Sequence, residues 1–395
     1  MSLNDFTQSD RFFQQRREKA TPLRYDSEML PDIKVIGVGG GGCNAVKRML
    51  RARIPGVTFV GVNTDAQALV SFEGAGTVRI GEKVTRGLGA GADPARGERA
   101  AQESQDELFE MLQRTDMVFV CAGMGGGTGT GAAPVLAEVA KDCGALTIGI
   151  VTKPFAWEGQ QKMRIAEEGI NKLREKVDTL IVIPNQRLLE ICPPDTTVDQ
   201  AFAVADDVLQ QAIQAISTII SQPGDINLDF NDVRTTMSEA GPALLSVGRA
   251  SGENRAAEAA RAATNSPLLD QSIEGARSLL WCITHNGHLG IRELDSAART
   301  ITELVDPNVR VIWGQVTDPS VGEDVVITVI ATGFPPKAQR MEDPRDTTRR
   351  ITEIIPGISS SEDAELPAFL RRDIRSLNDV RRMGSGSVAK LAERR

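Results

Sequence analysis

The chain has 395 residues and a formal net charge of −8, with 41% hydrophobic but only 4% aromatic residues. This length suits two domains with tails, whereas the acidic balance and the scarcity of aromatic rings argue against a nucleic-acid-binding protein. No apolar run reaches the ~18 residues of a membrane span, no signal-peptide core is present, and five scattered cysteines without metal or disulfide spacing are typical of the reducing cytoplasm.

The first elements expected are a disordered N-terminal extension, 1–30, and then an apolar strand, 33–38. The run Gly39 to Asn44 follows it, and a helix is expected over 45–53. Strand, glycine turn and helix together are typical of phosphate binding. A second strand, 57–62, ends at Asp65, which is either the ribose acid of a dinucleotide-binding fold or the N-cap of a helix over 66–72.

A second glycine cluster, 87–92, precedes a helix expected over 95–114, with Asp93 as its N-cap and Pro94 at its first position. This cluster is either a mobile phosphate loop or an ordinary surface loop. We favour the phosphate loop, because a glycine-rich segment that leads into a helix N-terminus presents backbone N–H groups to an anion.

The third cluster, 123–131, lies between a buried strand expected over 117–122 and a helix expected from about residue 132, with Pro134 in its first turn. Six glycines and two threonines in nine residues exceed the need of a tight turn, so we interpret it as a phosphate cradle. It contains no Walker A lysine. Phosphate charge would therefore be met by N–H groups, threonine hydroxyls, the helix dipole and a bound Mg²⁺.

Strands at 146–151 and 180–185 alternate with helices, which predicts a Rossmann-like parallel sheet covered on both faces, with ligands at the carboxyl ends of its strands. A long apolar helix over 199–221 resembles a spine between two halves. The organisation that we expect has six parts: extension 1–30, nucleotide-binding domain 31–198, central helix 199–222, smaller α/β domain with a mixed sheet 223–334, flexible linker 335–365, and a docking motif with a basic tail 366–395.

Several stretches in this order resemble the tubulin/FtsZ family of GTPases over about residues 32–372. They are the loop Gly125-Gly126-Gly127-Thr128-Gly129-Thr130-Gly131, the segments Gly39–Ala45, Val62–Asp65, Lys153–Phe155 and Asn227–Arg234, and the island Leu366–Arg371. The resemblance implies the fold of that family, with GTP or GDP and its Mg²⁺ across the strand ends. It also implies a GTP site built from these residues: Gly40, Gly41, Gly42, Cys43, Asn44, Ala90, Gly91, Gly127, Thr128, Gly129, Glu158, Lys162, Asn185, Phe202 and Asp206.

Within that site the resemblance implies a ribose contact for Glu158, stacking on guanine for Phe202, and hydrogen bonds to the base edge for Asn185 and Asp206. A carboxylate suits guanine, because it can accept from both N1–H and the 2-amino group. Two positions depart from the family pattern: Cys43 replaces a glycine, and Lys162 replaces an arginine, so that its phosphate contact would lack a bidentate fork and be weaker.

The resemblance further implies catalysis in trans. Asn227, Asp229 and Asp232 would position the water that attacks the nucleotide of the next subunit in a head-to-tail filament. The filament would form the cytokinetic ring at the mid-cell division site, and Leu366–Arg372 would bind division proteins and membrane tethers. N-capping is the alternative role for the two aspartates. A dinucleotide-dependent oxidoreductase and a nucleotide-binding scaffold without turnover remain as competing functions.

Overall fold

The computed structural model describes residues 31–334 apart from 53, 55, 71, 73, 191, 194, 222–228, 267–272, 274 and 306–307. The expected extension, linker, docking motif and basic tail lie outside the described residues, and so does Asn227.

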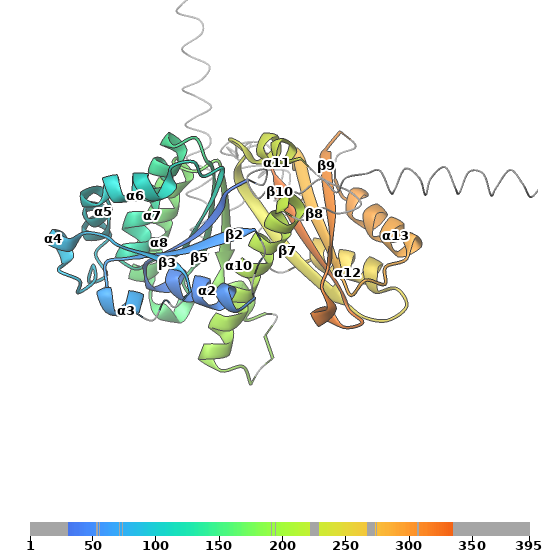
Figure 1. Cartoon of the computed structure of the whole chain (residues 1–395). Coiled ribbons are helices and arrows are strands. Elements are labelled where there is room, and N and C mark those ends of the chain that lie inside the picture. The colour runs from blue at the N-terminus through green and yellow to red at the C-terminus, as the bar shows by residue number, and fades with distance from the viewer. Residues whose placement is uncertain are drawn as a thin grey trace, which may run out of the picture. The chain divides into compact units, whose positions relative to one another are not determined.

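The first half of the described chain is a doubly wound parallel sheet (Figure 1). Its strands alternate with helices because each apolar run is followed by a glycine or polar turn and an amphipathic segment. The elements are β1 (Ile33–Val38), α2 (Gly39–Ala52), β2 (Val57–Asn63), α3 (Ala66–Val70), β3 (Gly76–Arg79), α4 (Glu82–Thr85), α5 (Pro94–Glu103), α6 (Gln105–Leu112), β4 (Met117–Gly123), α7 (Thr128–Asp142), β5 (Leu146–Lys153), α8 (Gln160–Arg174), β6 (Thr179–Pro184), α9 (Asn185–Leu188) and α10 (Val198–Ser221).

The second half is a mixed α/β layer, as the sequence predicts. It contains α11 (Phe230–Met237), β7 (Gly241–Ala250), α12 (Arg255–Thr264), β8 (Ser278–His285), α13 (Ile291–Thr302), β9 (Arg310–Thr317) and β10 (Val325–Thr332). Strand β10 runs antiparallel to β7 and β8, whereas β8 and β9 are parallel. A parallel contact between β6 and β7, from Thr179↔Gly241 to Ile181↔Ala243, joins both halves into one sheet of order β3-β2-β1-β4-β5-β6-β7-β10-β8-β9.

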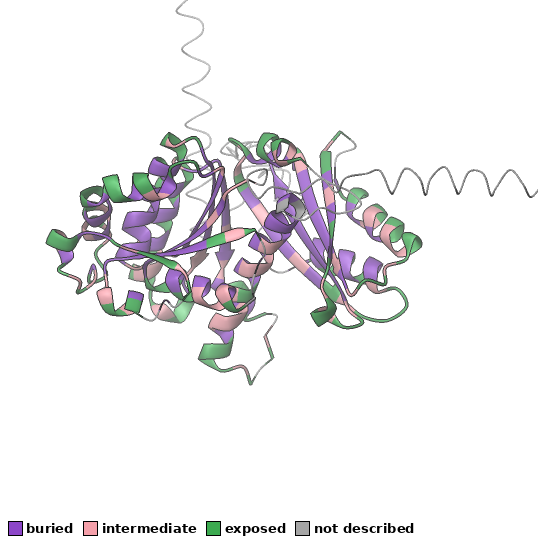
Figure 2. Ribbon diagram, in the orientation of Figure 1, coloured by how far each residue is buried: buried purple, intermediate pink, exposed green. Residues whose placement is uncertain are grey.

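Helix α10 packs between the two halves. Its buried side chains, among them Ile213 and Ile216, belong to one apolar cluster that includes Met49 of α2, Leu280 of β8 and Ile330 of β10. Figure 2 shows this buried interior continuing from one half to the other around the helix. Because apolar burial is the main stabilising term, the shared cluster fixes α10 to both halves. The prediction of a spine helix is therefore confirmed.

Three predicted helix boundaries are wrong. The helix expected over 95–114 is two helices, α5 and α6, and the Oγ of Ser104 between them accepts a hydrogen bond from the Gly81 amide at 3.2 Å. Helices α2 and α7 begin at Gly39 and Thr128, inside the glycine runs, so Pro134 lies beyond the first turn of α7. Glycine has a poor helix propensity, but here close packing against neighbouring backbone overrides it. None of the helices within the described ranges is long and apolar enough to cross a bilayer.

Candidate functional site

A cavity of about 510 Å³ opens at the carboxyl ends of β1, β4 and β5. All three glycine clusters of the sequence contribute to its lining. It is lined by Gly40, Gly41, Gly42, Asn44, Arg48, Ala90, Gly91, Ala92, Ala122, Gly123, Met124, Gly126, Gly127, Thr128, Gly129, Thr152, Pro154, Glu158, Lys162, Asn185, Asp199, Phe202, Ala205, Asp206 and Leu209. The cavity thus lies at the carboxyl ends of the strands, where the sequence predicts that ligands bind.

Every residue expected to bind the nucleotide lines this cavity except Cys43. Its side chain is 1% exposed, and its Sγ donates to the carbonyl oxygens of Gly37 at 3.3 Å and Val62 at 3.7 Å. Burial raises the pKa of the Cys43 thiol to about 12. The thiol is therefore an inert core group, and any contact of Cys43 with a ligand is limited to its backbone.

The helix N-termini of α2 and α7 meet at the cavity wall. Gly39 has a φ of +70°, and a Cβ there would lie 2.6 Å from the Gly129 nitrogen. The loop before α7 is fixed by its own polar groups, since the Gly125 amide donates to Thr130 Oγ1 at 2.9 Å and the Thr64 and Thr128 hydroxyls lie 2.6 Å apart. Two helix starts thus point unpaired N–H groups at one volume, which favours an anion.

Not every glycine of the third cluster serves the cavity. A Cβ on Gly131 would lie 2.0 Å from the carbonyl oxygen of Pro94, at the start of α5. A Cβ on Gly97 of α5 would likewise lie 2.3 Å from the Gly127 oxygen. These glycines let α5 pack closely on α7 and place 90–92 over the cavity. The surplus of glycine that predicted a phosphate cradle is therefore partly a requirement of helix packing.

One end of the cavity combines an acid, an amide and aromatic rings. Asp206 of α10 forms an ion pair with Arg48 of α2 at 3.2 Å. Burial raises the pKa of Asp206 to about 6, while Arg48 opposes that shift and Asp207 adds to it. Asn185 is 4% exposed, and its Oδ1 atom is buried without a hydrogen-bond partner. A buried acceptor without a hydrogen bond lowers the stability of the fold. Asn185 lines the cavity, so a ligand with N–H donors could supply the missing bond.

Aromatic side chains back this end of the cavity. The ring of Phe202 lies 5.4 Å from that of Phe155 and 6.4 Å from that of Trp157, nearly perpendicular to both. Phe155 and Trp157 stack with their centroids 5.4 Å apart. Such edge-to-face and stacked contacts hold the Phe202 ring in place beside the polar groups. The cluster supplies one flat apolar surface suited to a purine.

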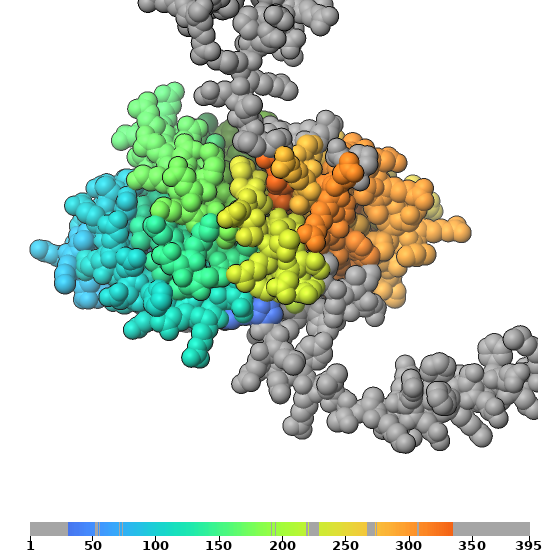
Figure 3. All heavy atoms as spheres, turned by 90° about the horizontal axis from the view of Figure 1, so that it is seen from above, coloured from blue at the N-terminus to red at the C-terminus, as the bar shows by residue number. Residues whose placement is uncertain are grey.

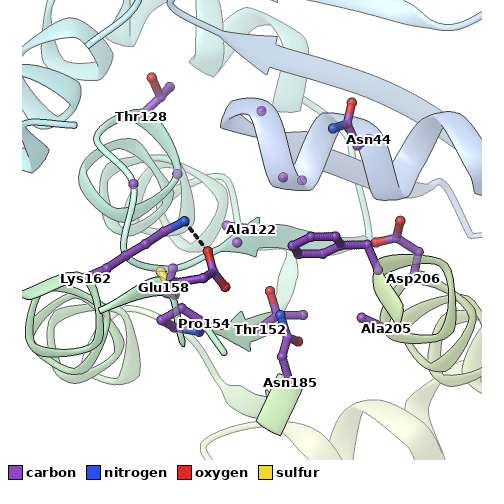
Figure 4. A pocket seen from close by; sticks show the side chains of 18 of the residues that line it. Asn44, Ala122, Thr128, Thr152, Pro154, Glu158, Lys162, Asn185, Ala205 and Asp206 are labelled. Atoms are coloured by element: carbon purple, nitrogen blue, oxygen red, sulfur yellow. Dashed lines mark hydrogen bonds and ion pairs between the residues drawn. The ribbon is translucent and has the colours of Figure 1, made fainter. Parts of the chain in front are cut away.

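The opposite wall carries a second acid–base pair (Figure 4). One oxygen of Glu158 accepts from the Phe155 amide at 2.8 Å, and the other binds the Lys162 ammonium. Because Lys162 lies one helical turn after Glu158, it pairs with that acid and does not extend alone into the cavity. The basic residues of the cavity lining, Arg48 and Lys162, are thus both paired.

Sequence reasoning did not identify Arg48 or Asp199 as lining residues. Arg48 lies four residues after Asn44 and so shares its helix face, a spacing that would have placed it at the cavity. Its partner Asp206 is on a distant helix, and nothing in the sequence spacing indicates that pair. The sequence left two roles open for Asp65, a ribose acid or a helix N-cap. Its Oδ1 accepts from the Gln67 amide at 2.9 Å, which makes it the N-cap of α3.

Asp229 and Asp232 do not line this cavity. Asp229 is the N-cap of α11, its side chain accepting from the Asn231 amide at 2.7 Å, and Asp232 forms an ion pair with Arg310 at 3.6 Å. Arg234 of α11 donates to the Gly144 oxygen, just before β5 begins. This contact places α11 at the amino end of the parallel strands, whereas the cavity lies at their carboxyl ends. For Asp229 the alternative role as an N-cap is therefore confirmed. The catalytic role of Asp229 and Asp232 stays a prediction, because it requires a second chain.

No cluster of three or more histidine, cysteine or acidic side chains able to hold a metal occurs among the residues that the structure describes. The cavity end near 40–42 and 127–129 offers backbone groups and the Thr128 hydroxyl, and no carboxylate lines that end. A Mg²⁺ ion here would fit as one held by phosphate oxygens and water, the usual arrangement for this ion.

These features define a class of nucleotide-binding proteins. The class has a doubly wound sheet with glycine loops that suit phosphate, no P-loop lysine, and a long helix that connects the sheet to a second α/β half. The comparisons with known proteins identify it further. Residues 32–193 match the GTPase domain of the Tubulin/FtsZ family, and residues 241–335 match the C-terminal domain of the FtsZ family. The chain belongs to the tubulin/FtsZ family, whose members bind GTP or GDP, and it carries that family's GTPase domain.

Among solved structures, the chain is similar to an empty FtsZ dimer from M. jannaschii, with 40% identity over 84% of this chain and 93% of that one, at a TM-score of 0.74. A mutant FtsZ from the same organism is 41% identical over 80% of this chain and 96% of that one, at a TM-score of 0.75. CetZ1 from Haloferax volcanii, a GDP-bound monomer, shares the fold at 23% identity over 81% of this chain and 99% of that one, with a TM-score of 0.66.

Proposed function

We propose that this GTPase hydrolyses GTP at the contact between successive subunits of a head-to-tail filament. The observation that carries the proposal is the separation of the two halves of the site. The phosphate loops lie at the carboxyl ends of the parallel strands, whereas Asp229 and Asp232 lie on α11, at the amino ends. Helix α10 lines the cavity as far as Leu209 and continues to Ser221, which is about 18 Å farther at 1.5 Å per residue. Asp229 and Asp232 follow that far end and do not line the cavity of their own chain.

In this proposal GTP lies across the cavity with its phosphates at 40–44, 90–91 and 127–129. Guanine meets Asp206 and Asn185 and stacks on Phe202, Glu158 binds the ribose, and Lys162 contacts a phosphate. The orphan Oδ1 of Asn185 would accept a hydrogen bond from the base, and ionised Asp206 would accept from N1–H and the 2-amino group. Mg²⁺ enters with the nucleotide and neutralises phosphate charge when bound.

Asn227, Asp229 and Asp232 of the neighbouring subunit would orient the attacking water. Phosphoryl transfer needs positioning and charge neutralisation more than covalent chemistry, so carboxylates at a helix start are suitable groups. Assembly is seen among related structures, since the FtsZ from M. jannaschii is a dimer and CetZ2 from Haloferax volcanii is a protofilament. A heterologous contact that does not close generates an open filament.

The wider role is proposed on the family alone. The filament would form the cytokinetic ring at the mid-cell division site of a bacterial cytoplasm. Leu366–Arg372 would bind division proteins and membrane tethers, with no nucleic acid involved. We also propose the division into a GTP-binding domain 31–198, a central helix 199–222, a catalytic α/β domain 223–334, a linker 335–365 and a tail 366–395.

The test is phosphate release from GTP as a function of protein concentration. Catalysis in trans predicts a concentration threshold, together with filaments in electron micrographs that require GTP. The variant Asp232→Asn should bind GTP like the wild type and lose turnover. Turnover proportional to protein from the lowest concentration, or unchanged turnover in Asp232→Asn, would show that α11 does not complete the site.

A further inference from the structure

The described lining of the cavity offers few positive side chains for the phosphates. Its basic residues, Arg48 and Lys162, are each paired with an acid, although Nη1 of Arg48 is buried without a hydrogen-bond partner. Lys162 packs against the 123–131 loop, since a Cβ on Gly125 would lie 2.7 Å from its Cγ. The walls at 40–42, 90–92 and 127–129 bear no basic side chain. Negative charge that develops on a triphosphate in the transition state is usually met by Arg, Lys or a metal ion. A neighbouring subunit could therefore add a cation that is not already held by an acid of this lining.

A suitable cation accompanies the proposed catalytic aspartates. The Nη2 atom of Arg310 lies 3.6 Å from Oδ1 of Asp232, and the two side chains are 50% and 47% exposed. Arg310 is the first residue of β9, and its amide is held by the Arg277 oxygen at 3.1 Å, so its backbone is fixed. Figure 1 shows α11 and this end of β9 close together, and in Figure 3 the corresponding regions lie against each other on one face.

Neighbouring basic side chains are already occupied. Arg234 donates to the Gly144 oxygen at 2.9 Å, and Lys141 pairs with Asp178, whose other oxygen accepts from the Thr147 amide. Arg310 differs from both in its partner, because it is held by an exposed ion pair with Asp232, whereas Arg234 binds a backbone oxygen and Lys141 pairs with the buried Asp178. Its guanidinium keeps further N–H donors for a ligand. An exposed pair of this kind contributes little to stability, so the fold does not require Arg310.

We propose that Arg310 is a further catalytic residue, which enters the next subunit's cavity with Asp232 and binds the γ-phosphate there. This rests on the proposed function, since it places both side chains at the same intersubunit contact. The oxygen of water bonds to the γ-phosphorus while the bond to the β–γ bridging oxygen breaks. The electron pair of the broken bond stays on GDP, and the protons of the water are transferred to phosphate and solvent. Arg310 neutralises charge on the γ-phosphate oxygens, while Asp232 orients the water beside it.

The experiment compares full-length wild type, Arg310→Ala, Arg310→Lys and Asp232→Asn, with GTP turnover expressed per sedimented polymer. A crowding agent is used where needed to bring all variants to equal polymer mass. The control is Arg299→Ala, which removes an arginine paired with Asp295 on α13. We expect Arg310→Ala to lose at least ~10-fold in turnover per polymer, because an arginine finger contributes on the order of 10³-fold or more. Arg310→Lys should retain part of the rate, and Arg299→Ala all of it.

A mixture of Arg310→Ala with Asp232→Asn identifies which subunit supplies the arginine. If both residues come from the same neighbour, every interface in the mixed filament lacks one of them and turnover stays low. Recovery to about a quarter of the wild-type rate, the share of interfaces in a random equal mixture at which both intact residues meet, would place Arg310 on its own subunit's nucleotide and overturn the inference. Wild-type turnover per polymer in Arg310→Ala would also overturn it while leaving the proposed function standing. Wild-type turnover in Asp232→Asn would instead overturn the proposed function itself.

Discussion

Nucleotide affinity should depend on pH through Asp206. Burial raises the pKa of this carboxyl to about 6, and only its ionised form can accept hydrogen bonds from both N1–H and the 2-amino group of guanine. With a pKa near 6, about nine tenths of the chains carry the carboxylate at pH 7 and about one tenth at pH 5. Affinity for GDP should therefore weaken about tenfold from pH 8 to pH 5, or ~1.4 kcal/mol.

Two substitutions should move the midpoint in opposite directions. Arg48 lowers the pKa of Asp206 and Asp207 raises it. Removing the arginine in Arg48→Met should shift the midpoint to higher pH, and removing the acid in Asp207→Asn should shift it to lower pH. Asp206→Asn should bind weakly, with the carboxyl's contribution to the pH dependence gone.

The assay is equilibrium binding of GDP below the concentration at which the protein assembles, measured by calorimetry from pH 5 to pH 8. Phosphate groups themselves titrate near pH 6, but that contribution is the same for every variant, so differences between variants isolate the carboxyl. The reasoning is refuted if wild type and Asp206→Asn show the same pH profile, or if Arg48→Met and Asp207→Asn leave the midpoint in place.

Three further outcomes are expected. Gly131→Ala should destabilise the fold by about 1–3 kcal/mol or more, because its Cβ would meet the Pro94 oxygen at 2.0 Å; Gly126→Ala, with open space around it, serves as the matched control in thermal unfolding. Thr130→Val should leave the buried Gly125 amide unsatisfied and cost about 1–3 kcal/mol, whereas an unchanged midpoint of unfolding would show that this bond contributes nothing. Cys43, Cys121 and Cys282, whose pKa values burial raises to about 12, should resist alkylation at pH 8 until the protein unfolds, and peptide mass spectrometry would reveal any early labelling.

The sequence predicts the elements well where local patterns determine them. Apolar runs bounded by glycine gave β1, β4 and β5 to within two residues, and Asp93 caps α5 through a bond to the Ala95 amide, as expected. It fails where backbone packing decides. Gly39 and Thr128 begin helices only because two helix N-termini pack against each other, a contact between residues far apart in the chain.

The cavity residues were predictable to a similar extent. The glycine loops were predictable from the sequence because each is a short local pattern, whereas Glu158 and Asp206 were placed in the site only by the resemblance to the tubulin/FtsZ family. The Arg48–Asp206 pair joins residues on α2 and α10, and the inward direction of Cys43 depends on packing against β2; neither is visible in spacing. Side-chain direction and long-range pairing are thus what the structure adds to the sequence.

The arrangement of charge explains why turnover in such a protein would depend on assembly. Within the cavity, each basic side chain has an acid of its own, so nucleotide binding rests on backbone N–H groups, helix termini and base contacts. In the proposed mechanism such a site binds a triphosphate, and the groups that favour the transition state over the ground state come from the next subunit. The groups that would make this distinction, Asp232 and Arg310, form an ion pair on another face of the same chain. Under the proposed function, contact with a second copy would bring binding and catalysis together.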